Sequence, residues 1–315
     1  MSELVTIGIT CFNAKATIAR AIKSALNQDW QNFEILIVDD CSLDCSVEII
    51  QDVIKNDSRA RLIKHSVNLG PAGARNTILD QAMGEYIVYF DDDDESLVSR
   101  ISEQIQCLLS FEKRTGKELI ACYASGRRLY PNGYEKSLYA IGSRQDNQVP
   151  HGSAVADYLL YFKQNKSWFY GAGTPTCALL ARISTIKAIG GFDSNLRRVE
   201  DIDFAIRLAL NDGYFIGTSK VLFKQYVTEA FDKNPKNNLN AEQAVVRKYF
   251  EYLSEKNKYY YAYNWPLIRY FYFNNKYYHS AVTFIKIFIK YPLYSMQHIL
   301  KTGSRRLLHD LRISK

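Results

Sequence analysis

The first 90 residues alternate short, apolar, β-rich runs with single stretches of helical periodicity. Strands separated in this way by single helices are typical of a doubly wound sheet whose strands run parallel. Ligands of such sheets bind at the carboxyl ends of the strands. The pattern therefore predicts an α/β fold with its binding site at that edge. The expected strands are residues 4–10, 33–39, 60–65 and 85–90, and the expected helices lie near 15–27, 44–56 and 72–83.

All four expected strands end in chemically distinctive residues, and the fourth ends in an acidic run, DDDDE. Five carboxylates behind an apolar strand are costly, because like charges repel and desolvation raises carboxyl pKa values, unless a cation or several donors lie among them. A solvated turn that caps the next helix is the alternative for this run taken alone. The coincidence of four such strand ends favours a shared site. They are residues 10–13, Asp39 with Asp40, the segment NLGPAGARN, and residues 91–95.

Two common nucleotide-binding motifs are absent from the sequence. No GxGxxG follows the first strand and no GxxxxGK[ST] occurs anywhere. The chain therefore lacks the phosphate-binding loops of dinucleotide-dependent dehydrogenases and of P-loop proteins. An acidic strand end can instead hold a nucleotide through a bridging divalent ion, because carboxylate oxygens suit Mg²⁺ or Mn²⁺.

The composition is that of an ordinary globular protein, with 47% apolar residues among 315. Six cysteines form no CxxC pair, which favours a reduced, cytoplasmic protein. The five histidines share no metal-ligand spacing, and the beginning of the chain shows no secretion signal.

Six segments resemble, in order and spacing, the family 2 glycosyltransferases of bacterial surface-polysaccharide assembly. The resemblance covers about residues 4–225 and implies the GT-A fold, a nucleotide-diphospho-sugar transferase domain with a Rossmann-like, doubly wound mixed sheet. A catalytic domain is expected at residues 1–230 and a helical extension at 240–315. The six segments are ITCFNAKATIARAIKSALNQ, FEILIVDDCSLD, NLGPAGARN, GEYIVYFDDDDES, GGFD and VEDIDFAIRL.

The resemblance also implies which residues bind a nucleotide-sugar donor, with UDP as the expected carrier. Phe12 would stack on the uracil ring, Asp40 would accept a hydrogen bond from it, and Asp39 would support the same turn. Arg75 would lie near the nucleotide or its diphosphate; a helix-surface ion pair is the alternative for this residue. Thr10 would line the uracil pocket, and Asn13 belongs to the same expected set.

The acidic run resembles the DxD motif of this family. Asp91 and Asp93 match its outer pair, which makes Asp93 the first expected ligand of Mn²⁺ or Mg²⁺ and Asp91 the second. Asp92 stands where the family often has a small or neutral residue, so contact with donor sugar or ribose and a metal register shifted by one both stay open. Asp94 and Glu95 are expected to begin the following amphipathic helix.

The segment GGFDSNLRRVEDIDFAIRLAL predicts a tight turn and then a helix with Glu200 and Asp201 in its first turn. From the residues alone, capping of that helix explains these acids. The resemblance implies that Asp201 is the general base, with Glu200 as supporting neighbour and fallback. A single base opposite a metal-held leaving group implies displacement with inversion. No QxxRW motif follows, so a non-processive enzyme is expected.

The last 35 residues hold seven Lys or Arg side chains against Asp310 alone, mixed with aromatic and aliphatic residues. Lysines interrupt every apolar run, so no stretch reaches the roughly 20 residues of a membrane span. A helical end of this kind is expected to lie on the anionic inner face of the cell membrane, where lipid-linked saccharide acceptors of capsule, O-antigen or lipooligosaccharide assembly are found. Nothing resembles a base-reading module, so nucleic acid is not an expected partner.

Two other functions stay open at this point. The chain could be a catalytically degenerate transferase that acts as a scaffold or partner at the membrane. A phosphatase of the haloacid dehalogenase type also places DxD after a strand, but it expects Thr or Val where this chain has Glu95.

Overall fold

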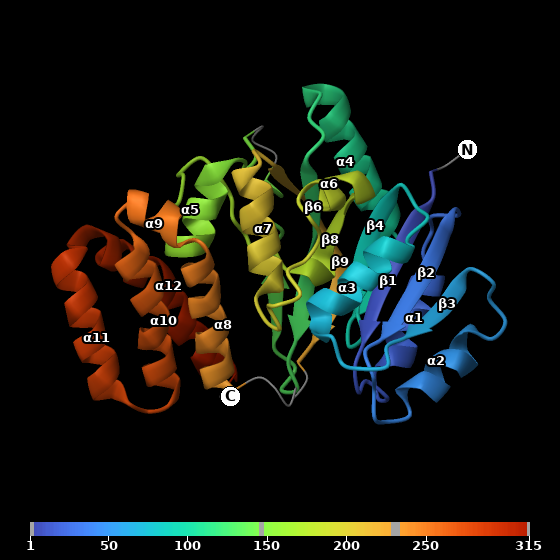
Figure 1. Cartoon of the computed structure of the whole chain (residues 1–315), viewed down its shortest axis with the longest axis horizontal. Helices are drawn as coiled ribbons and strands as arrows, with labels where there is room; N and C mark the ends of the chain where they lie inside the picture. The colour runs from blue at the N-terminus through green and yellow to red at the C-terminus, as the bar shows by residue number, and fades with distance from the viewer. Residues whose placement is uncertain (1–2, 145–147, 228–233, 314–315) are drawn as a thin grey trace. The chain divides into compact units, whose positions relative to one another are not determined.

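The computed structural model describes residues 3–144, 148–227 and 234–313, with side chains as far as residue 303. The described chain forms two compact units, which are treated separately below (Figure 1). The first unit comprises the chain up to Leu129 together with Glu135–Ala156 and Gln164–Val227. The second comprises Tyr130–Tyr134, Asp157–Lys163 and the described chain from residue 234.

The expected parallel sheet is present in the first unit. Strand β1 pairs in parallel with β2 and β4, and β2 pairs in parallel with β3. The prediction of four strands separated by single helices is confirmed. The elements are β1 (Val5–Cys11), α1 (Ile18–Leu26), β2 (Phe33–Asp39), α2 (Ser46–Ile54), β3 (Ala60–Lys64), α3 (Gly70–Gln81) and β4 (Tyr86–Asp91).

The rest of the first unit extends this sheet into a mixed one with the order β3-β2-β1-β4-β8-β6-β9-β5. Strand β8 is antiparallel to both β4 and β6, and β7 pairs with β6. The predicted mixed α/β architecture is confirmed. The further elements are β5 (Glu95–Ser96), α4 (Arg100–Thr115), β6 (Ile120–Leu129), β7 (Glu135–Leu138), α5 (Ser153–Tyr161), η1 (Thr176–Ala178), β8 (Leu179–Arg182), α6 (Ile183–Ala188), α7 (Glu200–Leu210) and β9 (Tyr214–Tyr226).

The prediction that Asp94 and Glu95 begin a helix is wrong. Glu95 lies in β5 and is the register partner of Lys224 in β9, while α4 begins only at Arg100. The Glu95 carboxylate accepts hydrogen bonds from Lys224 Nζ at 3.1 Å and from the Tyr226 hydroxyl at 2.8 Å. These partners are about 130 positions away in the chain. Pairing with a distant strand therefore determines the conformation of Glu95, and the local preference of acidic residues for a helix start does not.

Strand β1 shows how the sheet is covered on both faces. Val5, Ile7 and Ile9 alternate toward one buried cluster, where they meet Ile22 of α1 and Ile105 of α4. This alternation follows from the two-residue period of a strand. Helices α1 and α4 therefore cover the same face of the sheet.

Helix α3 lies against the opposite face of β1. A Cβ atom built on Gly8 would come within 2.6 Å of Ile78 Cγ2, so this glycine lets helix and strand approach closely. The start of α3 lies at the carboxyl end of β2, because Leu69 and Gly70 donate to Asp40, and Arg75 further along α3 reaches Asp91 at the end of β4.

The second unit is helical. Its rings pack tightly: the His298 ring stacks on Trp265 and on Phe162 with centroids 4.0 Å apart in each pair, and its Nδ1 lies 2.8 Å from the Tyr261 hydroxyl. Burial lowers the pKa of His298 to about 3, so this ring is neutral at physiological pH. The helices are α8 (Pro235–Lys248), α9 (Phe250–Glu255), α10 (Tyr259–Phe273), α11 (Tyr277–Lys290) and α12 (Pro292–Ile313).

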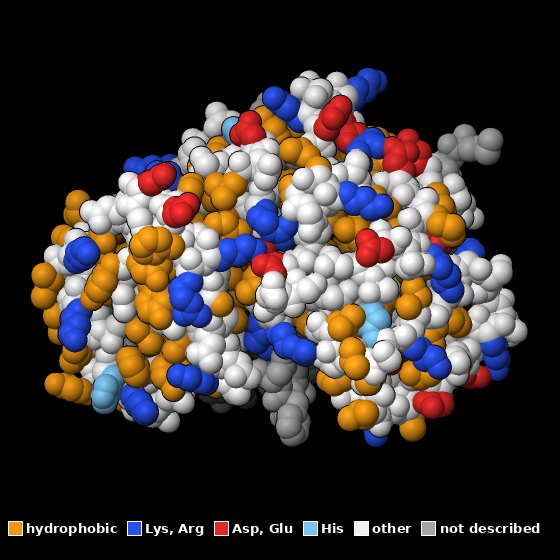
Figure 2. Space-filling view, viewed as in Figure 1, with side chains coloured by type: hydrophobic (Ala, Val, Ile, Leu, Met, Phe, Trp, Pro, Cys, Tyr) orange, Lys and Arg blue, Asp and Glu red, His pale blue; other side chains and the backbone are white. Residues whose placement is uncertain are grey.

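Part of the surface of the second unit is apolar and basic. Figure 2 shows hydrophobic and basic side chains intermingled over α10 and α11. Tyr278, Ile285 and Ile289 recur at helical spacing on α11 and are 54% to 77% exposed, and Leu293 and Met296 of α12 are also exposed. The predicted contributions of Arg305, Arg306 and Arg312 concern side chains outside the described part, and Lys315 lies outside it altogether. Within the described residues, no helix has both the length and the hydrophobicity needed to cross a membrane.

Candidate active site

Arg75 of α3 joins the two acidic segments that the sequence singled out. Its guanidinium pairs with the Glu200 carboxylate at the start of α7, and its Nη2 lies 3.7 Å from Asp91 Oδ1 at the end of β4. The Arg75 and Glu200 side chains are 8% and 9% exposed, so the alternative of a helix-surface ion pair does not describe them. Although burial opposes its charge, Glu200 and Asp91 raise the pKa of Arg75. The guanidinium therefore stays protonated.

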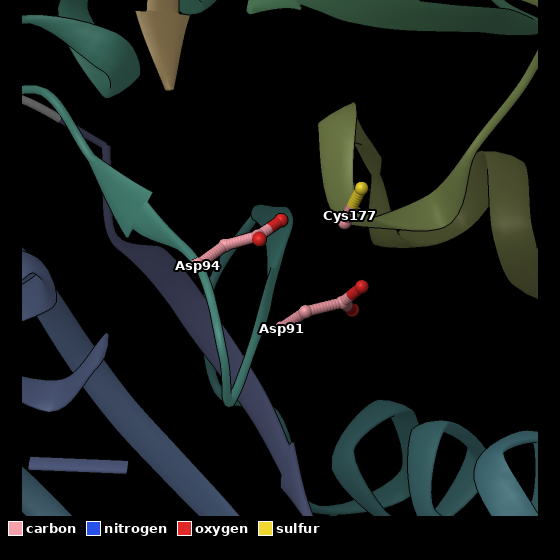
Figure 3. Close-up of side chains that lie close together, drawn as sticks. All are labelled: Asp91, Asp94 and Cys177. Carbon is pink, nitrogen blue, oxygen red and sulfur yellow. The ribbon is translucent and has the colours of Figure 1, made fainter. Parts of the chain in front are cut away.

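The acidic run turns inward after β4. In Figure 3 the carboxylates of Asp91 and Asp94 extend toward η1, the segment that carries Cys177. Their ligand atoms all lie within 4.8 Å of one another. Both oxygens of Asp94 are buried, and the backbone N–H of Tyr226 opposes the rise that burial causes in the pKa of this carboxyl. Two carboxylates this close to each other fit the ligand set of a divalent cation.

The pKa values of the acidic run also show that its negative charges are destabilised by burial and by one another. Burial, then the charges of neighbouring aspartates, raises the pKa of Asp92 and that of Asp94 to about 8. The pKa of Asp91 is raised by burial as well, although Arg75 opposes the shift. Asp93, the first predicted metal ligand, contributes to each of these shifts but is not a member of the cluster with Cys177.

Arg20 and Arg100 hold the acidic run in place. Arg20 donates to the backbone carbonyl of Asp93. Arg100 is fully buried and its Nη2 donates to the carbonyl oxygens of Tyr89 at 2.9 Å and Cys177 at 2.7 Å. Burial lowers the pKa of Arg100 to about 10, which still leaves it charged at neutral pH.

The end of β1 lies beside the acidic run. Thr10 is the register partner of Asp91, and the backbone N–H of Phe12 donates to Asp92 Oδ2 at 3.1 Å. Phe12 is 48% exposed. The structure thus brings the predicted donor-binding residues Thr10 and Phe12 together with the acidic run at one edge of the sheet.

Asp39 and Asn13 fix the loop that follows β2. Asp39 Oδ2 accepts from the backbone N–H of Ser42 at 3.0 Å, while its buried Oδ1 has no hydrogen-bond partner among the residues described. Asn13 Oδ1 accepts from the backbone N–H of Leu43 at 2.8 Å. Of these two residues, Asp39 therefore keeps an acceptor for a ligand.

Asp40 is fully engaged by the protein. Its carboxylate accepts from the backbone N–H groups of Leu69 at 2.8 Å and Gly70 at 2.7 Å, and His65 Nδ1 lies 2.8 Å from Oδ1. Gly70 has φ of +80°, a conformation that glycine adopts without a steric penalty. Asp40 thus positions the turn that leads into α3 and Arg75.

The acids at positions 200 and 201 lie in the first turn of α7, as predicted. Asp201 is partly exposed, and its Oδ1 accepts from the N–H of Ile202 at 2.8 Å. Burial, and then the charge of Glu200, raises the pKa of Asp201 to about 6, while Arg75 opposes the shift. A carboxylate with this pKa is largely ionised at pH 7 and accepts a proton more readily than an ordinary aspartate.

Sequence reasoning missed Asp94, Arg100 and Cys177 as parts of this site. Asp94 was expected to begin a helix, and Arg100 to lie on an amphipathic one. Cys177 comes from a segment, GTPTCALL, that carries no recognised motif. The only signal in the sequence was the excess of acidic residues in the run itself. That many carboxylates need more cationic or hydrogen-bond-donating groups than Arg75 alone supplies.

Comparison with protein families assigns the first third of the chain. The model "Glycosyl transferase family 2" matches residues 6–113, which contain β1–β4, Arg75 and the acidic run. The chain carries a family 2 glycosyltransferase domain. This confirms the family resemblance for the four sequence segments that lie within residues 6–113; the segments GGFD and VEDIDFAIRL lie outside the match.

Curated relatives match the same glycosyltransferase domain. The UDP-Glc:alpha-D-GlcNAc-diphosphoundecaprenol beta-1,3-glucosyltransferase WfaP of Escherichia coli is 45% identical over 103 residues, which are 33% of this chain and 40% of the relative. The GalNAc(5)-diNAcBac-PP-undecaprenol beta-1,3-glucosyltransferase of Campylobacter jejuni is 33% identical over 127 residues, 36% of this chain and 41% of the relative. The matched part of the chain thus spans about two fifths of either relative.

Solved structures of S. aureus TarS resemble the chain beyond the glycosyltransferase domain. The structure of TarS 1–349 with UDP-GlcNAc aligns with a TM-score of 0.58 and 19% identity, covering 85% of this chain and 73% of TarS 1–349. The structure of TarS 1–349 alone gives a TM-score of 0.56, also at 19% identity, over 86% of this chain and 73% of that one. At this level of identity the likeness concerns the fold, and it supports the predicted GT-A architecture.

Proposed function

We propose that the protein is an inverting, metal-dependent, non-processive glycosyltransferase that moves a sugar from a UDP-sugar to a saccharide or lipid-linked saccharide. The observation that carries this proposal is the Arg75 bridge, which joins the acids after β4 to the acid pair at the start of α7. One acidic group suits the donor diphosphate and the other suits proton transfer. The names of two relatives describe sugar transfer to undecaprenyl-linked saccharides, which matches this substrate class.

Asp201 is the proposed general base. With its pKa raised to about 6, its carboxylate takes the proton of the acceptor hydroxyl at neutral pH. The hydroxyl oxygen then forms a bond to the anomeric carbon while the bond from that carbon to the diphosphate oxygen breaks, and UDP leaves with the bonding electrons. Attack opposite the leaving group inverts the anomeric carbon. Glu200, held by Arg75, positions the helix turn that carries Asp201.

The chemistry of the acidic run fits a divalent cation. The short separation of the Asp91 and Asp94 carboxylates and the raised pKa of Asp91 and of Asp92 are the observations that favour one. Burial raises the pKa of Cys177 well above its usual value, so this thiol stays protonated and oxygen ligands remain for Mn²⁺ or Mg²⁺. Asp91 and Asp93 are the proposed ligands. A bound ion neutralises charge that develops on the leaving diphosphate.

The uridine part of the donor is proposed to bind between Phe12 and Asp39. Phe12 is exposed, and Asp39 offers a buried oxygen without a partner among the described residues. An unpaired buried acceptor is costly, so a ligand N–H that reaches it gains affinity. Thr10 lies at the same strand end, and Asn13 and Asp40 hold the surrounding loops.

The helices of the second unit are proposed to bind the anionic inner face of the cell membrane, as part of a cytoplasmic, peripheral protein. No Asp or Glu occurs between residues 256 and 309, whereas nine Lys or Arg side chains do. The exposed stripe of Tyr278, Ile285 and Ile289 lies on a helix that also presents Lys286 and Lys290. Basic charge beside exposed apolar residues favours an anionic lipid surface. Lipid-linked acceptors are held at such a surface.

The first experiment is a calorimetric titration of UDP with and without Mn²⁺, with GDP, CMP and dTDP for comparison. Native protein is compared with Asp93→Ala and with Asp52→Ala, a control at an exposed carboxylate on α2. We expect UDP binding that requires Mn²⁺ and is lost only in Asp93→Ala. Binding that ignores both metal and Asp93 would remove the metal assignment. No nucleotide binding at all would favour the scaffold function instead.

A further inference from the structure

A small cavity lies behind Cys177 in the first unit. Its volume is about 80 Å³, and most of its lining is apolar, including Ala124, Ala140, Pro175 and Phe223. Since a single water needs roughly 10–15 Å³ of such space, the cavity has room for several heavy atoms, and a lone hydroxyl would leave most of it empty. The cavity opens to the surface at Tyr139 and Ala172, which are exposed, so a ligand can enter it.

The cavity adjoins both halves of the candidate active site. Cys177 forms part of its wall and also belongs to the cluster with Asp91 and Asp94. Tyr123 forms another part of the wall, and after burial the charge of Asp201 is the next contribution that raises the pKa of this tyrosine. Two residues of the cavity wall are therefore close to the candidate acids: Cys177 to Asp91 and Asp94, and Tyr123 to Asp201.

One residue of the cavity wall has a buried hydroxyl without a hydrogen-bond partner among the described residues. It is Tyr123, whose side chain is only 1% exposed. Buried polar groups are almost always hydrogen-bonded, so an occupant with an acceptor is expected here.

We propose that this cavity receives the acetamido group of an N-acetylated sugar, with the Tyr123 hydroxyl donating to its carbonyl oxygen. An acetamido group has four non-hydrogen atoms, a methyl end that suits the apolar wall, and one strong acceptor. The inference rests on the proposed function and narrows its substrate class. The group belongs either to the transferred sugar or to the acceptor sugar, since both rings meet between Asp201 and the acidic run.

A sugar carboxylate is the competing occupant, because Arg128 also lines the cavity. The Arg128 guanidinium already donates to Gln225 Oε1 at 2.8 Å through its Nε. Among the described residues, no other cationic side chain lines the cavity, and most of its wall is apolar. The lining therefore favours an uncharged group.

Two variants and one matched control test the proposal. Tyr123→Phe removes the hydroxyl and keeps the ring, and Ala172→Leu narrows the cavity at an exposed position of its lining, where folding is not at risk. Tyr86→Phe is the control, because it removes another buried tyrosine hydroxyl of the same sheet that does not line the cavity.

In the donor arm, calorimetry compares the affinities for UDP-N-acetylglucosamine, UDP-glucose and UDP-glucuronic acid. In the acceptor arm, release of UDP from the tightest-binding donor compares octyl N-acetylglucosaminide with octyl glucoside. We expect one arm to show a preference of at least about tenfold for the acetamido compound. Tyr123→Phe should reduce that preference about threefold to tenfold, Ala172→Leu should abolish it, and Tyr86→Phe should leave it unchanged.

The inference is overturned by equal use of acetamido and hydroxyl compounds in both arms, by preference for the glucuronic acid donor, or by a preference that neither cavity variant changes. Binding of UDP alone, measured by calorimetry, distinguishes failure of the cavity assignment from failure of the proposed function. Native protein that binds UDP but shows no acetamido preference loses the cavity assignment alone. Native protein that binds no UDP loses the proposed function and the cavity assignment together.

Discussion

The guanidinium of Arg75 and the carboxylate of Glu200 form a buried ion pair that joins α3 to α7. The two residues are 125 positions apart, yet both side chains are less than one tenth exposed. Because Arg75 also lies 3.7 Å from Asp91, one cation is shared by acids on two sides of the site. The relative position of those acids therefore depends on a single side chain.

Replacing Arg75 by alanine should destabilise the protein strongly, because Glu200 and Asp91 would remain buried without their cation. The free energy of unfolding is expected to fall by about 3–5 kcal/mol, measured by urea denaturation. Arg59→Ala, which removes an exposed pair with Asp57, should cost less than about 1 kcal/mol. Equal effects of the two substitutions would mean that the Arg75 pair is not the buried link between the helices.

The transfer rate should depend on the ionisation of Asp201. Because its pKa is raised to about 6, kcat/KM is expected to rise with pH below about 6 and to level off above it, as the base form becomes populated. Asp201→Asn should lower kcat by about 10²–10⁴-fold. If Glu200→Gln instead removes the acidic limb while Asp201→Asn keeps it, Glu200 is the base.

The acidic run should make stability fall as pH rises. Asp94 has its pKa raised to about 8, against about 3.9 in an unfolded chain, so the folded state binds more protons between these values. The stabilising contribution of Asp94 to folding is fully present below about pH 4 and is lost as pH rises through about 8. We expect Tm to decline over this window, and to decline less in Asp94→Asn than in the exposed control Asp52→Asn.

The same run predicts how added metal acts. Mn²⁺ should raise Tm more at about pH 8 than at about pH 5, because ligand carboxylates must lose their protons before they bind it. Removal of the ion by EDTA should reverse the gain. An equal gain in Asp91→Asn would show that the ion binds elsewhere.

Asp39 should contribute to nucleotide affinity through its unpartnered Oδ1. Asp39→Asn keeps the shape of the side chain but weakens the acceptor, and UDP affinity is expected to fall about tenfold, equivalent to about 1.4 kcal/mol. Glu48→Gln, at an exposed position of α2, is the control. If calorimetry shows that Asp39→Asn binds UDP as tightly as the native protein, the uracil ring does not bind at Asp39.

The second unit should direct the protein to anionic vesicles. Co-sedimentation with phosphatidylglycerol vesicles is expected to weaken with salt and to fall severalfold for each of Lys286→Glu and Lys290→Glu, at about 1 kcal/mol per charge. Ile289→Ser should also weaken it by removing an exposed apolar side chain. Lys55→Glu in the first unit is the control. Equal loss in that control would mean that net charge alone governs binding.

The order of strands and helices could be predicted from sequence because each β1–β4 element carries a local period. Val5, Ile7 and Ile9 alternate inward along β1, and the acids of α7 lie at a helix start. The four strand ends were sufficient to expect a shared site. The roles of Arg75 and Asp201 in that site were implied by the family resemblance, because the local pattern at Asp201 is explained by helix capping alone.

What sequence could not supply was pairing over long separations. Glu95 lies in β5 because β9 supplies its partners, and Cys177 reaches the acids only because η1 crosses the end of β4. No local sequence pattern predicts either of these two placements. The orientation of Asp94, which became part of the site, follows from that pairing and not from its own neighbours in the chain.

Arg100 connects the acidic run to the cavity wall through main-chain atoms alone. It donates to the carbonyl oxygens of Tyr89 and Cys177, so these two bonds do not require either of those side chains. The distance between β4 and the cavity wall is therefore expected not to depend on the side chains of that wall. If the cavity binds a sugar as proposed, its preference can be changed by exchanging cavity side chains one at a time without moving the acids.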